Sequence, residues 1–463
     1  MTTGERTISN EELATHTPTS SSVWIAIRGS VYDVTHFLSS HPGGASVIKN
    51  VAGTDATAAF EMAHAIPLDS LPEGVTKVGI TAIPYVAPKS TAAPQLPVAE
   101  EVMITPIDFV PAAQRRMAAN GWIYYATAAE DEHTLRRNKD IFNAFLFCPR
   151  VCVDVSNVRM DTVILGVKSS LPLFVGGAAL QGLAYSGAEV TMCKAAHRAG
   201  VPQLVPHFSS KSLDDIAAAR AEGQPLFFQL YMHPDRAKAE AMLKRIVALG
   251  FHAVFLTVDA PQLGRRERDL RQKYAGHLPA AYQAASTKRE AGVATALNSF
   301  IAQDLTWKDV TWIKGILGRV KLVLKGVQRA DDAVRAVELG CDGLLLSNHG
   351  GRQLDTCRTG VEVLIEVTAE LRRRNLLDKI ELFVDGGVWR GRDIAKCLAL
   401  GARAVGVAKA PIFAMAAGGE DAVVHCLSMF RDELRNTMAL LGATNTSEVS
   451  ADMVTRDTFL SRL

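Results

Sequence analysis

Eight short apolar runs, spaced from about residue 170 onward, constrain the fold of this chain more than any other feature. They lie at 171–177, 201–205, 226–231, 253–259, 321–325, 343–347, 381–385 and 404–408, with amphipathic stretches between them. Apolar strands that alternate with helices are typical of a parallel sheet with both faces covered. Eight such units favour a (β/α)8 barrel over a doubly wound sheet, and no GxGxxG turn follows the first run.

Two shifts in composition divide the 463 residues. Residues 6–83 are mixed in composition, and a stretch rich in proline and alanine follows them. Proline fixes φ and removes a hydrogen-bond donor, so this stretch is predicted to be a semi-extended linker. The sequence therefore predicts a small α+β domain at 6–83, a linker at 84–105 and a barrel domain at 106–463.

The overall composition is that of a globular protein. A formal net charge of +2 gives no electrostatic case for nucleic acid, and no run approaches the roughly 20 apolar residues that span a bilayer. The seven cysteines match neither a disulfide framework nor a zinc site, so a reducing compartment is expected. The terminal Ser461-Arg462-Leu463 is a variant of the S-K-L signal, so we expect a peroxisomal location, with the cytoplasm as the alternative.

Two histidines stand out in the N-terminal domain. His41 opens the segment HPGG, and His64 follows it by 23 residues. Neutral imidazoles are good axial ligands for haem iron, and glycines let the backbone turn tightly beside a macrocycle. Residues 6–82 resemble cytochrome b5, and this resemblance implies that His41 and His64 are the two axial ligands of haem b. An iron with both axial positions filled would shuttle electrons and would not bind oxygen.

Polar residues follow the predicted barrel strands, where barrel enzymes place their chemistry. His349 can act as a general base, and Asp259 could orient it and stabilise the imidazolium that forms. Arg352 can hold a carboxylate through two parallel hydrogen bonds. Lys325, placed near a flavin ring, would stabilise negative charge on the reduced ring. These residues predict a barrel enzyme that acts on a small anionic substrate.

Several longer motifs connect the barrel to a known family. They include YYATAAEDEHT at 124–134, LTVDAPQLGRRE at 256–267, SNHGGRQLD at 347–355 and DGG at 385–387. Residues 107–463 resemble the FMN-dependent 2-hydroxy-acid dehydrogenases, which include glycolate oxidase and lactate dehydrogenases. With the cytochrome b5-like domain in front, the whole chain resembles the haem-containing L-lactate dehydrogenases. The resemblance implies FMN and haem b as cofactors, an (S)-2-hydroxy acid as substrate and a homo-oligomer.

The same resemblance implies roles for individual residues. His349 would be the catalytic base and Asp259 its partner. The substrate carboxylate would be bound by Arg352, Arg266 and Tyr124, and the substrate hydroxyl by Tyr231. Cofactor contacts are implied for Gln229, Thr257, Lys325, Ser347, Asp385, Gly387, Arg390 and Lys409. Phe208 and Ala179 are expected to lie near the side chain of the substrate.

The positions implied for the FMN phosphate depart from the family pattern. The family usually has two arginines after DGG, where this chain has Trp389-Arg390, and Gly-Arg near the eighth strand, where this chain has Ala408-Lys409. Lysine keeps the positive charge of arginine but loses its bidentate fork. We therefore expect either that FMN binds more weakly or that Arg390 turns to compensate.

Three functions remain open from the sequence. The leading prediction is oxidation of a 2-hydroxy acid to a 2-keto acid, with electrons passing from FMN to haem and on to a one-electron acceptor such as a cytochrome. The first alternative is an oxidase that transfers the electrons to oxygen and forms peroxide. The second is a non-catalytic haem electron carrier whose barrel has lost FMN, and the intact set around His349 argues against it.

Overall fold

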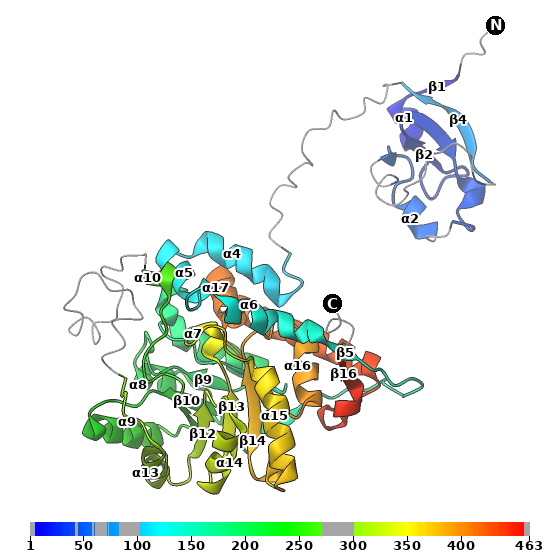
Figure 1. Cartoon of the computed structure of the whole chain (residues 1–463). Coiled ribbons are helices and arrows are strands. Elements are labelled where there is room, and N and C mark those ends of the chain that lie inside the picture. Colours follow the sequence, from blue (N-terminus) through cyan, green and yellow to red (C-terminus); the bar gives the residue numbers. More distant parts are fainter. Residues whose placement is uncertain are drawn as a thin grey trace. The chain divides into compact units, whose positions relative to one another are not determined.

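The chain folds into two compact units, Met1–Glu100 and Glu101–Leu463 (Figure 1). The computed structural model describes residues 5–41, 45–57, 60, 72, 74–82, 102–270 and 301–457. The predictions for His64, for residues 84–101 of the linker and for Ser461-Arg462-Leu463 lie outside these ranges. The division between the units falls inside the predicted linker.

The first unit is built on a four-stranded sheet. Its strand order is β1 (Thr7–Ile8), β4 (Thr76–Thr81), β3 (Ser30–Asp33) and β2 (Trp24–Ile27). β1 runs parallel to β4, and the other two pairs are antiparallel. Because successive side chains of a strand point to opposite faces, Trp24 and Ala26 enter one apolar cluster and Ile25 and Ile27 enter another. Helices α1 (Asn10–Ala14) and α2 (Ala45–Lys49) complete the predicted α+β unit.

The second unit is a closed barrel of eight parallel strands, in the order β10-β11-β12-β13-β14-β15-β8-β9. Each predicted apolar run contains one of these strands, so the (β/α)8 prediction is confirmed. The strands are β8 (Leu173–Val175), β9 (Gln203–Val205), β10 (Leu226–Leu230), β11 (Ala253–Thr257), β12 (Lys321–Lys325), β13 (Gly343–Leu346), β14 (Glu381–Asp385) and β15 (Ala404–Val407).

The interior of the barrel is filled with side chains and is not a pore. Four fully buried rings, with neighbouring centroids 5.6–6.3 Å apart, come from β8, β10, β11 and β14: Phe174, Phe227, Phe255 and Phe383. The hairpin of β6 (Thr162–Ile164) and β7 (Val167–Ser169) packs into the same cluster. Leu165 at its turn bonds Glu381 and His252, which stand at the start of β14 and just before β11. The hairpin therefore covers the amino ends of the strands and leaves the carboxyl ends for the site.

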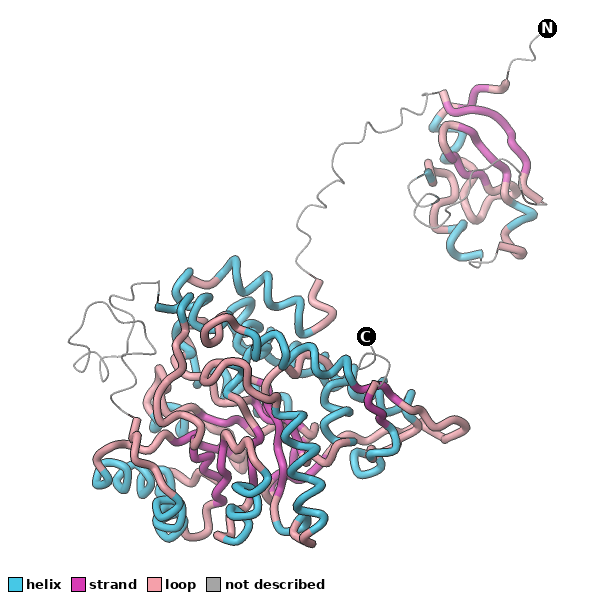
Figure 2. Tube along the Cα trace, viewed as in Figure 1, coloured by secondary structure: helices cyan, strands magenta, loops and turns pink. Residues whose placement is uncertain are grey.

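Helices surround the strands (Figure 2). The side chains of Asp235 and Thr359 cap α9 (Arg236–Ala248) and α15 (Gly360–Arg373) by accepting backbone hydrogen bonds from their first turns. The helices that connect or follow the strands are α7 (Ala188–Ala199), α8 (Leu213–Ala218), α9 (Arg236–Ala248), α10 (Glu267–Leu270), α13 (Trp307–Leu317), α14 (Ala330–Glu338), α15 (Gly360–Arg373), α16 (Gly391–Ala399) and α17 (Lys409–Leu441).

Three further helices precede the barrel: α4 (Phe109–Arg116), α5 (Ala119–Ala126) and α6 (His133–Asp140). α4 packs against α17, and α6 packs against the 3-10 turn η5 (His349–Gly351) that follows β13. β5 (Phe145–Phe147) pairs with β16 (Val454–Arg456), which joins this N-terminal layer to the end of the barrel domain. Among the described residues, no helix is long and apolar enough to cross a membrane.

Candidate active site

A cavity of about 670 Å³ opens at the carboxyl ends of the barrel strands. Most of the residues that the sequence assigned to a site line this cavity: Tyr124, Gln229, Tyr231, Arg266, Lys325, His349, Arg352, Asp385, Gly387 and Lys409. Phe208 and Ala179, expected beside the substrate, are also in its lining. Asp259, Thr257 and Ser347 stand behind lining residues and bond to them, whereas Arg390 lies elsewhere.

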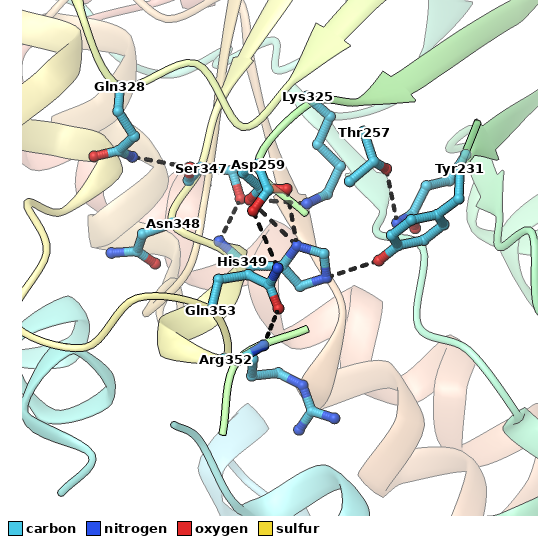
Figure 3. Close-up of polar contacts among 12 residues, drawn as sticks. Tyr231, Thr257, Asp259, Lys325, Gln328, Ser347, Asn348, His349, Arg352 and Gln353 are labelled. Atoms are coloured by element: carbon cyan, nitrogen blue, oxygen red, sulfur yellow. Dashed lines mark hydrogen bonds and ion pairs between the residues drawn. The ribbon is translucent and has the colours of Figure 1, made fainter. Parts of the chain in front are cut away.

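His349 is held between a carboxylate and a phenol (Figure 3). Its Nδ1 lies 3.1 and 3.2 Å from the two carboxylate oxygens of Asp259, and its Nε2 lies 3.0 Å from the Tyr231 hydroxyl. Because a carboxylate can only accept, Nδ1 carries the proton and Nε2 keeps its lone pair. The His349 backbone has a φ of 60°, in the left-handed region, which its surroundings must enforce.

The electrostatics keep this histidine neutral. Burial and, to a smaller extent, the positive charge of Lys325 lower the pKa of His349 to about 4, although Asp259 opposes the shift. Burial raises the pKa of Asp259, but the interactions of the carboxylate with the His349 ring and with the positive charge of Lys325 outweigh this effect and leave the pKa below its ordinary value. At neutral pH the pair is therefore a neutral imidazole beside a carboxylate. The imidazole can act as a base, and the negative charge of the carboxylate stabilises the imidazolium that forms.

Two arginines face the cavity near His349. Arg352 donates from Nη1 to the backbone oxygens of Tyr124 and Thr127, at 2.6 and 2.9 Å, and lies over the Tyr124 ring. Within the described residues its Nε and Nη2 make no hydrogen bond. Arg266 is only 4% exposed, and burial together with the charge of Arg352 lowers its pKa to about 10, so it stays charged at neutral pH. A buried cation beside a second, half-buried one favours an anionic ligand in the cavity.

Another part of the cavity lining, around Gln229 and Asp385, has buried oxygens without partners among the described residues. The buried oxygens Gln229 Oε1 and Asp385 Oδ1 have no hydrogen-bond partner among the described residues. The Gln229 amide donates to Thr257 at 3.4 Å, and the Lys325 ammonium donates to Ser347 at 3.5 Å. The two oxygens could accept hydrogen bonds from a bound ring with polar edges, and the Lys325 ammonium could stabilise negative charge on it.

Gly177 belongs to this part of the site. A Cβ added there would lie 2.2 Å from Gln229 Oε1, so the glycine leaves room for the present position of Gln229.

Arg390, which was predicted to contact the cofactor, lies elsewhere in the structure. The Arg390 guanidinium donates to Glu433 at 2.7 Å and is not in the cavity lining, so the structure does not bring Arg390 together with the other residues predicted to contact the cofactor. The cause is α16, whose first turn is anchored to Glu433 of α17 through the Gly391 amide as well. Trp389 does line the cavity and stacks on Phe413.

Lys409, at a position that the resemblance implies for the phosphate, lines the same cavity. Burial, with a smaller effect of Arg352, lowers the pKa of Lys409 to about 7. Together with unpaired acceptors and Lys325, this cation fits a ligand that has a polar ring at one end and a phosphate at the other. The residues present therefore fit FMN. The barrel and this lining define a class of protein, the flavin-dependent (β/α)8 enzymes.

Comparisons with known proteins identify the family. Residues 113–456 match the FMN-dependent dehydrogenase family, and residues 9–77 match the cytochrome b5-like heme/steroid binding domain. The chain belongs to the FMN-dependent dehydrogenases and carries a cytochrome b5-like domain in front of the barrel, which confirms both resemblances. Its cofactors are FMN and haem, as the sequence predicted.

Some relatives match nearly the whole chain, and others match about three quarters of it. An L-lactate dehydrogenase (cytochrome) of Wickerhamomyces anomalus is 36% identical over 455 residues, which cover 93% of this chain and 77% of that protein. An L-lactate oxidase of a Nostoc species is 36% identical and covers 74% of this chain and 95% of its own length. The crystal structure of the flavin-binding domain of baker's yeast flavocytochrome b2 aligns with a TM-score of 0.71 at 36% identity, over 78% of this chain and 88% of that one.

The described part of the haem unit fits its cofactor. The His41 imidazole is half-buried and packs edge-on against Phe37, with ring centroids 5.6 Å apart. Phe37 and Phe60 pack against the apolar cluster around Ile48. A histidine beside an apolar wall is the setting that an axial haem ligand requires.

Some residues of the site escaped the sequence analysis. Asn138 of α6 lines the cavity and exchanges two amide hydrogen bonds with Asn348, at 2.8 and 2.9 Å. His207 accepts the backbone N–H of Tyr231 at 3.3 Å, and burial lowers its pKa to about 4. Asn348 stands inside the SNHGGRQLD motif, which was a usable signal. Asn138 and His207 reach the site only through the fold.

Proposed function

We propose that this protein oxidises a 2-hydroxy acid of the lactate type to the 2-keto acid and passes the electrons through FMN and haem to a one-electron acceptor such as a cytochrome. The observation that carries the proposal is a neutral His349, backed by Asp259, in one cavity with two arginines that form no ion pair with a carboxylate among the described residues. A base next to a carboxylate-binding pair suits a substrate with a hydroxyl on the carbon beside its carboxylate.

Arg352 and Arg266 would bind the substrate carboxylate. The two backbone acceptors of Arg352 Nη1 fix its guanidinium plane, so Nε and Nη2 remain for the two carboxylate oxygens. Arg266 adds a second charge, and because it is buried its attraction to an anion is less screened than it would be in water. The Tyr124 side chain borders the same corner of the cavity.

His349 would accept the proton that leaves the substrate. Its Nε2 lone pair points to the Tyr231 hydroxyl, so a substrate hydroxyl or C–H beside Tyr231 lies within reach of the same atom. When Nε2 takes the proton, Asp259 at 3.1 Å stabilises the imidazolium. Tyr231 remains protonated throughout, because burial raises its pKa far above the ordinary value. It therefore acts as a hydrogen-bond donor and not as a base.

FMN, when bound, accepts the two electrons that leave the substrate, and the haem carries electrons one at a time. Within the barrel, Gln229, Lys325 and Asp385 would hold the flavin, supported by Thr257, Ser347 and Gly387, and Lys409 would hold the phosphate. Lys325 is buried and sits between the flavin side and the His349–Asp259 pair, where a cation favours negative charge on either neighbour.

An oxidase that uses oxygen as acceptor is the second candidate. It is supported by the similarity of the barrel to the Nostoc L-lactate oxidase. The cytochrome b5-like unit favours the first candidate, because an enzyme that transfers electrons directly to oxygen needs no haem relay. We also propose a homo-oligomeric assembly, from the family, and a peroxisomal location, from the terminal Ser-Arg-Leu. A fluorescent fusion with and without these three residues tests the location.

The function is tested by absorption spectra of the purified protein, recorded without oxygen before and after addition of L-lactate, D-lactate or glycolate. We expect the flavin band to bleach and the haem bands to shift to the reduced form, with L-lactate effective and D-lactate inert. A variant His349→Gln should retain both cofactors and lose the response. Flavin that stays oxidised with every acid would refute the proposal, and haem that stays oxidised beside bleached flavin would favour the oxidase.

A further inference from the structure

Gln353, which lies in the SNHGGRQLD motif, has no role in the chemistry described above. It is only 8% exposed, yet it is not in the lining of the cavity. Its side-chain amide donates to the backbone oxygens of Asp259 and Gln262, both at 3.0 Å, and accepts the backbone N–H of Gly264 at 3.1 Å. Both donor hydrogens and the acceptor are used, so the orientation of the amide is fixed.

All three bonds end in the loop that follows β11. This loop carries Asp259 and Arg266, whereas Gln353 belongs to the loop after β13, which carries His349 and Arg352. The amide therefore joins the two loops that supply the base, its carboxylate and both arginines. Figure 3 shows Gln353 next to Asp259 and His349.

The two loops approach so closely that little else fits between them. A Cβ added at Gly264 would lie 2.3 Å from the Gln353 backbone oxygen and 2.5 Å from that of Arg352. Arg266 Nε also donates to the Arg352 oxygen, at 3.4 Å, which is a weak bond. The Gln353 amide is the part of this junction with the most and the shortest bonds.

We propose that Gln353 is a positioning residue that sets the alignment of Asp259 with His349 during oxidation of the 2-hydroxy acid. This inference rests on the proposed function. The imidazole is held on its other side by the Tyr231 hydroxyl at 3.0 Å, so Asp259 must be aligned with Nδ1 from the loop after β11. The hydrogen bond from Gln353 to the Asp259 backbone oxygen holds Asp259 directly.

Loss of the amide should therefore weaken the chemical step more than the fold. The carboxylate of Asp259 would no longer be fixed against Nδ1, and a displacement of about 1 Å near a reacting group costs about 100-fold in rate. We expect Gln353→Met, which keeps the length of the side chain, to lower kcat by about 100-fold. The isotope effect with 2-deuterated L-lactate should rise, because transfer from the substrate carbon becomes slower than the electron-transfer steps.

The pH profile gives a second readout. Asp259 raises the pKa of His349, so a looser Asp259 allows burial to lower that pKa further. The acid limb of kcat/KM should move to lower pH in Gln353→Met. If Gln353 only supported the fold, the substitution would not shift the acid limb of the kcat/KM profile.

Gln224 offers a matched control. It is a buried glutamine that donates to the Cys193 oxygen and accepts from the Ala221 amide, at 2.9 and 3.0 Å, outside the cavity lining. Gln224→Met should lower the melting temperature by an amount similar to Gln353→Met and leave kcat and the pH limb unchanged. If Gln353→Met does not fold, the isosteric Gln353→Glu, which keeps the acceptor for Gly264, takes its place.

A double-mutant cycle decides the inference. If Gln353 acts through Asp259, Gln353→Met in an Asp259→Asn background should change kcat by less than about threefold. The same 100-fold loss in both backgrounds, or equal effects of the Gln353 and Gln224 variants on kcat, would overturn it. A wild-type protein that oxidises none of the acids would refute the proposed function instead, so the two failures are distinguishable.

Discussion

Lys409 makes the affinity for FMN a function of pH. Its ammonium group is the cation left at the phosphate end of the described cavity lining once Arg390 is bonded to Glu433, apart from the exposed Arg136 and Lys139 at the rim. A charge-assisted hydrogen bond contributes about 1.5–3 kcal/mol, or roughly 10- to 150-fold in affinity. Lys409→Met should therefore raise the Kd for FMN by roughly that factor.

The pH dependence follows from the lowered pKa of about 7. Below pH 7 the lysine is already protonated and ready for the phosphate. Above pH 7 it is neutral and must take up a proton when FMN binds, which costs up to about tenfold in affinity per pH unit. The other charged neighbours are Arg352, Arg266 and Glu132, and none is a residue type whose ordinary pKa lies between 7 and 9. The Kd for FMN should thus rise between pH 7 and pH 9.

The assay is quenching of flavin fluorescence by the protein stripped of FMN. Riboflavin, which lacks the phosphate, is the control ligand, and its Kd should not change with pH or with Lys409→Met. Lys409→Arg should remove the pH dependence, because the guanidinium stays protonated over this range. A Kd for FMN that is flat from pH 7 to 9 in the wild type, or a parallel change for riboflavin, would refute the reasoning.

Three further changes test other parts of the structure. Asp259→Asn keeps the size of the side chain but removes the charge that stabilises the imidazolium, and should lower kcat roughly 10²- to 10⁴-fold with haem content unchanged; a loss below tenfold would contradict the role of the pair. Phe208→Ala removes a ring whose centroid lies 5.2 Å from that of Tyr231 and so opens the cavity beside Tyr231. It should raise kcat/KM for aryl-substituted acids relative to L-lactate by about tenfold or more. An unchanged ratio would place the substrate side chain elsewhere. Phe255→Ala removes a fully buried ring from the barrel interior and should cost about 3–5 kcal/mol of unfolding free energy in denaturant titrations, while a cost below 1 kcal/mol would mean that the interior repacks.

The sequence by itself determined the architecture and most of the site. The apolar runs have the length and spacing of buried parallel strands, and the closure of eight of them into a barrel leaves one end for polar residues. That is why Tyr231, Lys325, His349 and Asp385, which are far apart in the chain, could be assigned to one cavity. Local sequence patterns predict the shared cavity because a residue directly after a parallel strand lies at the carboxyl end of the barrel, whichever strand it follows.

Only the tertiary structure decided which partners the side chains choose. Arg390 and Lys409 have the same charge and both lie near the implied phosphate. Arg390 is taken by Glu433 of α17, a contact between residues 43 positions apart, whereas Lys409 stays in the cavity. The amide pair of Asn138 and Asn348 and the bonds of Gln353 are equally remote in sequence. Such contacts depend on how helices and loops pack, and no local spacing encodes them.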